Sequence, residues 1–340
     1  MCNSRTVGRR MRGFTLVELM VAMVVGLLIV GGAFSLHIGS RDTQVANEAQ
    51  MDMVADARFA IELISQDLRS AGMWGRTSAD SFISCRDADP NGACTPTSTG
   101  DTPPSPMSGD CRPGWYYDLL PVFAHDGDVN GNPYAATCIS ASEGYVDGTD
   151  ILEIKYADAF PPPALLGSQA YIRSNAVNGR IFIGTTPPEL EANDSNALTD
   201  NFELNAVAYY ISDHTDNAGD GIPSLRRVSL VNSPGLQNQL LASGVVDLQV
   251  QLGIDVDGDK TVDRYVNPDQ VGGREEWMTN VYSAKIWLLM RTDKPMDGVD
   301  TEKTFTMAGT SDTYGGQDDY RYFMVSDVVS LRNLVLANTQ

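Results

Sequence analysis

The stretch that decides the fold is residues 11–36, which run MRGFTLVELMVAMVVGLLIVGGAFSL. The eighteen residues from Leu19 to Leu36 carry no charge, and a membrane-spanning helix needs roughly 17–25 largely apolar residues. A basic segment precedes this run and contains no acid; its arginines are Arg5, Arg9, Arg10 and Arg12. Because positive charge favours the cytoplasmic side of a membrane, the sequence predicts a membrane helix with a cytoplasmic N-terminus.

Glu18 is the one acidic residue at the start of this apolar helix. A lone carboxylate at membrane depth costs on the order of 2.5–3.5 kcal/mol by insertion scales. Such a residue usually serves a function and usually has a partner, so Glu18 is a candidate functional residue.

The segment Gly13-Phe14-Thr15-Leu16-Val17-Glu18-Leu19 resembles the motif shared by type IV prepilins and type II secretion pseudopilins. The resemblance implies that prepilin peptidase cleaves between Gly13 and Phe14 and that Phe14 is then N-methylated. It also implies that Glu18 serves assembly by pairing with the N-terminal amine of a neighbouring subunit, which gives a buried carboxylate a cation. Translation that starts at Met1 or at Met11 leaves the same cleavage position.

A second helical pattern follows the apolar run. Its apolar residues are spaced 3, 4, 3, 4 and 3 positions apart, which is one face of a helix: Val54, Ala57, Ile61, Ile64, Leu68 and Ala71. Gly72 predicts the end of this helix. We therefore expect one long helix from about Phe14 to Ala71, with its second half packed against a sheet.

The remainder of the chain shows recurring strand signals separated by turn residues. Predicted strands are Ile151–Tyr156, Arg180–Ile183, Ala206–Ile211, Leu225–Val231, Val245–Leu252, Val281–Met290 and Tyr322–Leu331. No helical runs alternate with them, so the expected fold class is α+β, a type IV pilin-like long N-terminal helix packed on an antiparallel β-sheet. The expected parts are a leader (1–13), an apolar half-helix (14–37), an amphipathic half-helix (38–72) and a β-rich head (73–340) with a cysteine-containing loop region (80–140).

Charge and cysteine content indicate which classes of partner and which cellular compartment suit the chain. The net charge of −20 makes nucleic acid an unsuitable partner. Apart from Cys2 in the leader, the cysteines are Cys85, Cys94, Cys111 and Cys138. An even number without metal-binding spacing predicts two disulfides in an oxidising compartment, and three pairings remain open.

Four later blocks resemble the PilW family of minor pilins: Tyr209-Tyr210-Ile211, Gly221 to Arg227, Gly253 to Asp259, and Val329 to Asn333. The resemblance implies a priming complex with other minor pilins in the bacterial inner membrane, with the head in the periplasm. It further implies a place at the pilus tip, next to the major pilin and a tip adhesin. The alternatives are a type II secretion pseudopilin, a calcium-dependent surface adhesin module, and a signal-anchored envelope protein.

An acidic run suggests a cation site. Aspartates occupy alternate positions typical of a calcium loop, and a backbone carbonyl completes the set: Asp255, Asp257, Asp259, Thr261 and Asp263. Lys260 stands where an EF-hand has glycine, and Val266 stands where it has glutamate, although Gly258 offers another position for the turn. The alternative is a solvated acidic turn between two strands. The sequence contains no HExxH, Walker, GxSxG or GxGxxG motif, so we expect no enzyme, no catalytic residue and no cofactor besides calcium.

Overall fold

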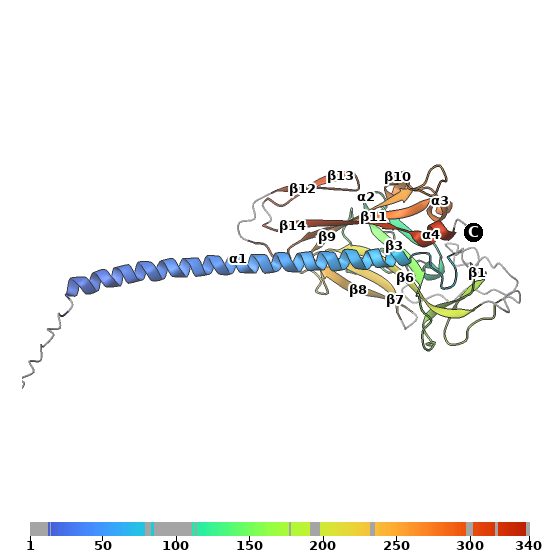
Figure 1. The fold of residues 1–340 in the computed structure, drawn as a ribbon, viewed down its shortest axis with the longest axis horizontal. Helices are drawn as coiled ribbons and strands as arrows, with labels where there is room; N and C mark the ends of the chain where they lie inside the picture. The colour runs from blue at the N-terminus through green and yellow to red at the C-terminus, as the bar shows by residue number, and fades with distance from the viewer. Residues whose placement is uncertain are drawn as a thin grey trace, which may run out of the picture. The chain divides into compact units, whose positions relative to one another are not determined.

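The computed structural model describes Gly13 and residues 15–78, 83–84, 111–112, 114–176, 178–190, 198–231, 235–296, 302–316 and 319–337. Its longest element is helix α1 (Leu16–Ser70), which is unbroken (Figure 1). The chain divides into two compact units, one ending at Met51 and the other beginning at Asp52, so α1 contributes to both. The long helix expected from Phe14 to Ala71 is confirmed. It begins two residues later than expected and ends one residue earlier.

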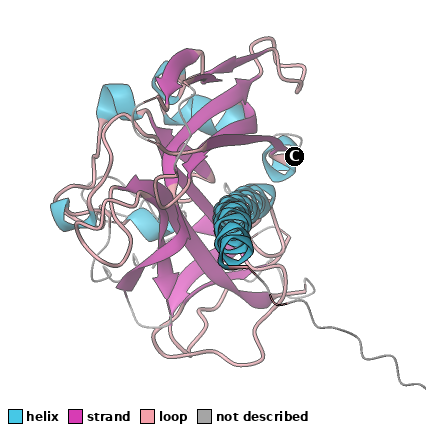
Figure 2. Cartoon of the chain, turned by 90° about the vertical axis from the view of Figure 1, so that its left-hand side faces the viewer, coloured by secondary structure: helices cyan, strands magenta, loops and turns pink. Residues whose placement is uncertain are grey.

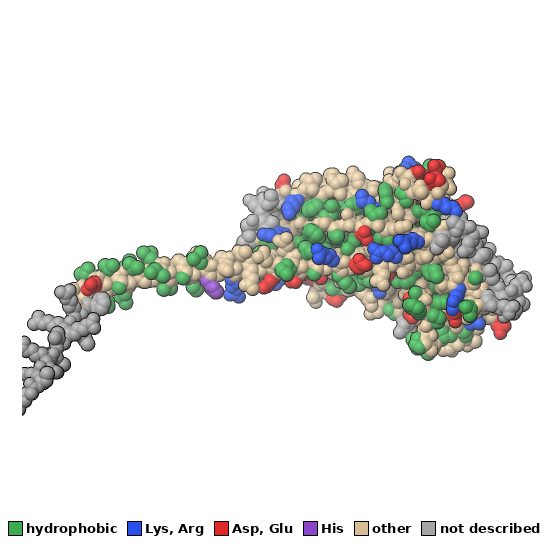
Figure 3. Space-filling model, in the orientation of Figure 1, with side chains coloured by type: hydrophobic (Ala, Val, Ile, Leu, Met, Phe, Trp, Pro, Cys, Tyr) green, Lys and Arg blue, Asp and Glu red, His purple; other side chains and the backbone are tan. Residues whose placement is uncertain are grey.

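The first half of α1 buries none of its described side chains. Every described side chain from Leu16 to Met51 is exposed or partly exposed, and apolar side chains lie along the visible face of this segment (Figure 3). Helix α1 is long and apolar enough to cross a membrane. Its apolar surface is therefore available to lipid or to other helices.

The second half of α1 buries its predicted stripe. Ala57, Ile64 and Leu68 have no solvent-exposed surface, and they share one core with residues of two sheets, among them Tyr209 and Leu248. Figure 2 looks along α1 and shows the strands of the head beside it. The stripe thus lies against β-structure, as its spacing predicts.

The head contains a large sheet of eight strands. They run in the order β1 (Ile83–Ser84), β5 (Gly179–Ile183), β4 (Ala170–Ser174), β6 (Asp200–Ser212), β3 (Ile151–Ala157) and β2 (Val122–His125), while β7 (Ser224–Val231) pairs with β6 and β8 (Gly235–Ser243) pairs with β7. All pairs are antiparallel except β1 with β5. The long β6 therefore joins two groups of strands.

A second sheet covers the other side of the core. Its antiparallel order is β10 (Arg264–Val266), β9 (Val245–Ile254), β11 (Val281–Arg291) and β14 (Tyr322–Ser330). A separate hairpin of β12 (Lys303–Met307) and β13 (Thr310–Tyr314) contributes Met307 to a small cluster with Trp287 and Leu289 of β11. All seven predicted strands are present.

Short helical segments lie between these strands, and one follows the last strand. They are η2 (Trp115–Tyr117), α2 (Gly127–Asn130), η3 (Ala141–Glu143), η5 (Pro268–Gln270), α3 (Arg274–Thr279) and α4 (Arg332–Ala337). A further core on the other face of the large sheet includes Trp74, Trp115 and Tyr210. A disulfide joins Cys111 to Cys138, with 4.6 Å between their Cα atoms. Cys85 and Cys94 lie outside the described residues.

Polar contacts also join α1 to the head. Asp67, only 4% exposed, accepts hydrogen bonds from the hydroxyls of Tyr156 (2.8 Å) and Tyr209, and the Arg227 guanidinium lies 3.8 Å from it. Asn333 donates to the carbonyls of the helix end at Arg69, Ser70 and Ala71 at 3.1–3.4 Å. A buried carboxylate requires such partners, so α1 has a fixed register on the sheet.

Gly72 ends the helix as expected. Its φ is +75°, and a Cβ there would meet Leu334 at 2.8 Å and Pro121 at 3.4 Å. Only glycine combines this left-handed conformation with such close packing.

Candidate functional site

The N-terminal motif forms a capping box at the start of α1. Oε2 of Glu18 accepts from the backbone N–H and the hydroxyl of Thr15, and the Glu18 N–H donates to Thr15 Oγ1, all at 3.3 Å. This reciprocal arrangement satisfies amides that a helix start leaves without partners, and it places negative charge at the positive end of the helix dipole. Phe14 lies outside the described residues. The sequence carries the signal for this cap in Thr15-x-x-Glu18, beside the assembly role that the prepilin motif implies for Glu18.

The acidic run forms a tight loop between β9 and β10. Carboxylate oxygens of Asp255, Asp257 and Asp263 lie within 4.8 Å of one another. Asp259 instead accepts from the N–H and hydroxyl of Thr261, at 2.8 and 2.6 Å. The structure therefore brings together three of the four predicted aspartates.

Backbone amides hold this loop in shape. Asp255 accepts from the N–H groups of Gly258 and Lys260, and Asp263 accepts from that of Val256, each at 2.7 Å. Gly258 and Lys260 both have positive φ, 81° and 68°. The turn thus uses Gly258, as the sequence suggested, and also places a lysine in the left-handed region. Hard carboxylate oxygens in a tight loop are the donor set that calcium prefers.

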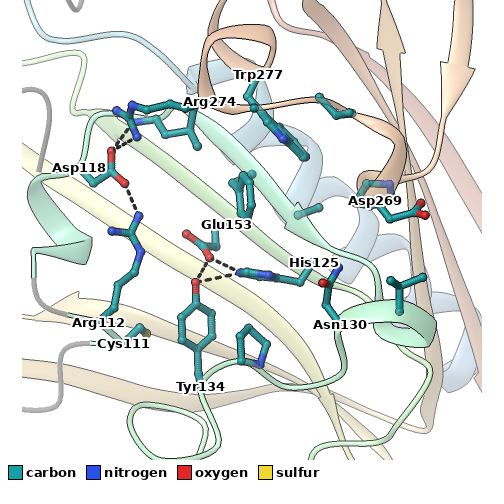
Figure 4. Close-up of a pocket in the computed structure, with 18 of the residues that line it drawn as sticks. Cys111, Arg112, Asp118, His125, Asn130, Tyr134, Glu153, Asp269, Arg274 and Trp277 are labelled. Carbon is teal, nitrogen blue, oxygen red and sulfur yellow. Dashed lines mark hydrogen bonds and ion pairs between the residues drawn. The ribbon is translucent and has the colours of Figure 1, made fainter. Parts of the chain in front are cut away.

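A pocket of about 930 Å³ opens where the two sheets meet. Its walls come from the segment around Cys111–Asp118, from β2, β3 and α2, and from the η5–α3 connection of the second sheet (Figure 4). These segments are far apart in the sequence. The pocket therefore exists only in the folded head.

One end of the pocket is an arginine cluster. The Arg112 and Arg274 guanidinium groups both form ion pairs with Asp118, which is 1% exposed (Figure 4). Burial alone would raise the pKa of Asp118, but the positive charges of Lys155, Arg274 and Arg112 hold it below its usual range. Asp118 is therefore ionised at neutral pH.

Glu153 forms the centre of the pocket floor. It is 2% exposed, accepts from Trp115 Nε1 at 2.7 Å, and contacts His125 Nε2 at 3.0 Å and the Tyr134 hydroxyl. Burial opposes ionisation of Glu153, but the nearby Lys155 and the bond to His125 lower its pKa. Burial and the Glu153 charge together raise the pKa of Tyr134, which keeps its proton. This network is rigid and charged.

Aromatic rings line the remaining wall. The ring of Phe123 lies 4.5 Å from that of Trp277 and 4.8 Å from that of His125, and His125 lies 5.2 Å from Tyr134. Sequence reasoning did not find this pocket. Its members carry no motif, and only folding brings together residues as distant as Asp118 and Arg274.

Two family models match the chain. One, described as the prokaryotic N-terminal methylation motif, covers residues 8–34. The other, described as type IV pilus-assembly protein W (PilW), covers residues 208–333, from within β6 into α4. An N-methylation motif on a long helix that packs against an antiparallel head defines a type IV pilin. Together with the second match, it supports a PilW-type pilin.

A solved structure is also similar. It is a type IV-like pilin from Thermus thermophilus, with 13% sequence identity, a TM-score of 0.26, and coverage of 57% of this chain and 79% of that one. No curated protein sequence matches the chain. The family whose model matches residues 208–333 is described as a pilus-assembly protein.

Proposed function

We propose that this chain is a minor pilin that primes the assembly of a type IV pilus and remains at its tip. The proposal rests on the difference between the two ends of α1. One end of this helix carries the N-methylation motif and apolar surface, and the other end is fixed to the head by Asp67 and a buried stripe. A head held in one register on an assembly helix is suited to building a defined complex.

The proposed path begins in the inner membrane, where the N-terminal half of α1 is the single membrane span and the head lies in the periplasm. Prepilin peptidase cleaves before Phe14, and Phe14 is N-methylated. The chain then joins other minor pilins, the major pilin and a tip adhesin. Within that complex Glu18 pairs with the N-terminal amine of a neighbour.

Deletion of the gene tests the priming role. We expect surface pili per cell, counted by electron microscopy, to fall sharply and to return when the wild-type chain is supplied. Mass spectrometry of the restored protein should show methylated Phe14 as the N-terminus. Normal piliation in the deletion strain would contradict priming. Normal piliation with lost secretion of exported proteins would indicate the pseudopilin alternative.

We also propose that the acidic loop binds calcium, because three carboxylates of the described chain meet within 4.8 Å there. Calorimetric titration of the chelator-treated full chain should show calcium binding that Asp257→Asn weakens at least about tenfold. Asp312→Asn, an exposed aspartate on β13, is the matched control and should change nothing. Absence of binding heat in the unmodified chain would exclude this site.

A further inference from the structure

One end of the pocket at the junction of the sheets is cationic. Arg112 and Arg274 line this end with Asp118 and Glu153, and Lys155, which is buried behind the lining, is paired with Glu153 at 3.5 Å. Asp269, the third carboxylate of the lining, lies away from this end (Figure 4). The chain as a whole carries a net charge of −20. A local cationic site in such an acidic protein favours an anionic ligand group.

The cationic end is accessible as well as charged. The side chains of Arg112 and Arg274 are 34% and 36% exposed, while the Asp118 carboxylate between them is almost fully covered. Planar guanidinium groups match carboxylates in shape and charge, and two arginines at one position favour a carboxylate over a neutral group. Asp269 and Asn130 lie away from this end, as Figure 4 shows.

The remaining lining favours an apolar body next to that carboxylate. Phe123, Leu120 and Val271 contribute hydrocarbon to the wall, and Trp277 packs on Phe123. Trp277 and Tyr134 are only 3% and 4% exposed. They close the wall without presenting a broad ring face, which is what a stacked sugar would need. An apolar side chain requires only the hydrocarbon surface that the wall supplies.

We propose that this pocket binds the C-terminal carboxylate of a partner polypeptide that ends in an apolar residue. The carboxylate lies against Arg112 and Arg274, and the last side chain lies against Phe123 and Leu120. The pocket volume is within the range of sites that enclose a small ligand. Capture of a chain terminus by its charge is a known mode of peptide recognition. This inference goes beyond the priming role and does not depend on it.

Fluorescence anisotropy tests the proposal with the full chain in lipid nanodiscs, with empty nanodiscs as the blank. The probes are fluorescein-labelled pentapeptides ending in Leu, Ile, Val, Met, Phe or Trp, each with a free carboxylate or a C-terminal amide. We expect at least one free-carboxylate peptide to bind with a Kd below about 1 mM, and its amide to bind at least about tenfold more weakly.

Two variants separate binding from folding. Arg274→Gln should weaken binding at least about tenfold, and Arg264→Gln, an exposed arginine on β10 outside the pocket, should not. Val129→Trp adds bulk at an exposed rim position without touching the ion pairs and should also block binding. The proposal is overturned if no free-carboxylate peptide binds, if amides bind equally well, or if Val129→Trp has no effect. Binding of glucuronate or sialyllactose in place of the peptides would also overturn it.

Discussion

The two halves of α1 belong to one unbroken helix but differ in what surrounds their apolar side chains. From Leu16 to Met51 the side chains are exposed, and the segment is apolar around its whole circumference over Leu19–Leu36. From Asp52 to Ser70 one face is buried, and the exposed face is mostly polar, with Phe59 as its large apolar residue. A helix that is apolar all round needs an external apolar partner, whereas an amphipathic helix already has a core. One continuous helix can therefore expose an apolar surface in one half and stabilise a folded core with the other.

The largest expected effect concerns Glu18 in the first half. Glu18→Ala removes both the charge and the cap, whereas Glu18→Gln removes the charge and keeps a residue that serves a capping box. If the charge pairs with a neighbouring amine, both variants should reduce surface pili to the level of the deletion strain, while the unfolding free energy of the head stays unchanged. Pilus counts and denaturation curves measure the two effects. Normal piliation with Glu18→Gln would assign the role to the cap.

The next largest effect concerns Asp67 in the second half. Asp67→Ala leaves Tyr156, Tyr209 and Arg227 without their buried acceptor, so we expect the free energy of unfolding to fall by about 3–5 kcal/mol. Denaturant titration followed by tryptophan fluorescence measures it. The control is Glu62→Ala, whose side chain is 70% exposed and should cost less than about 1 kcal/mol. Equal losses in both variants would contradict the anchoring role.

A matched pair of leucines compares the halves directly. Leu68 has no exposed surface and Leu28 is 72% exposed. Leu68→Ala should lower the unfolding free energy of the head by about 2–4 kcal/mol, because it leaves a cavity in a packed core. Leu28→Ala should leave that free energy unchanged in the same denaturant titration. A similar loss at Leu28 would show that the first half also packs on the head.

The smallest expected effect concerns the end of α1. Asn333→Ala removes the donor to three terminal carbonyls, and we expect a loss of about 1 kcal/mol in unfolding free energy. Asn217→Ala, at an exposed loop position, serves as the control. A melting temperature that is unchanged in Asn333→Ala would show that water satisfies these carbonyls equally well.

Local patterns predicted local structure well. The stripe from Val54 to Ala71 and the stop at Gly72 are properties of neighbouring residues, and the structure has both. Apolar runs such as Val281–Met290 likewise became strands because β-branched and aromatic residues suit a buried sheet. The acidic loop was found for the same reason, since its aspartates are close in sequence.

Features that depend on tertiary pairing were missed. Strand β8 reads GLQNQLLAS, and β13 reads TSDTY; their polar composition predicts no strand, and their backbones are extended because β7 and β12 pair with them. Strands β1, β2, β4 and β12 were missed as well, whereas β10 is the strand expected after the acidic loop. Glu153 and Lys155 are buried in β3 because charges from other segments surround them. The spacing of residues along the sequence does not indicate which distant charges will surround a buried one.

The Thr15–Glu18 capping box has a thermodynamic consequence for incorporation of a subunit. Before assembly, the Glu18 carboxylate already accepts hydrogen bonds within its own chain, from two Thr15 donors at 3.3 Å. If Glu18 pairs with a neighbouring amine as proposed, that contact replaces existing partners, and only the free-energy difference between the two states drives addition of the subunit. The internal bonds therefore lower the net gain from the contact and make the addition step more readily reversible.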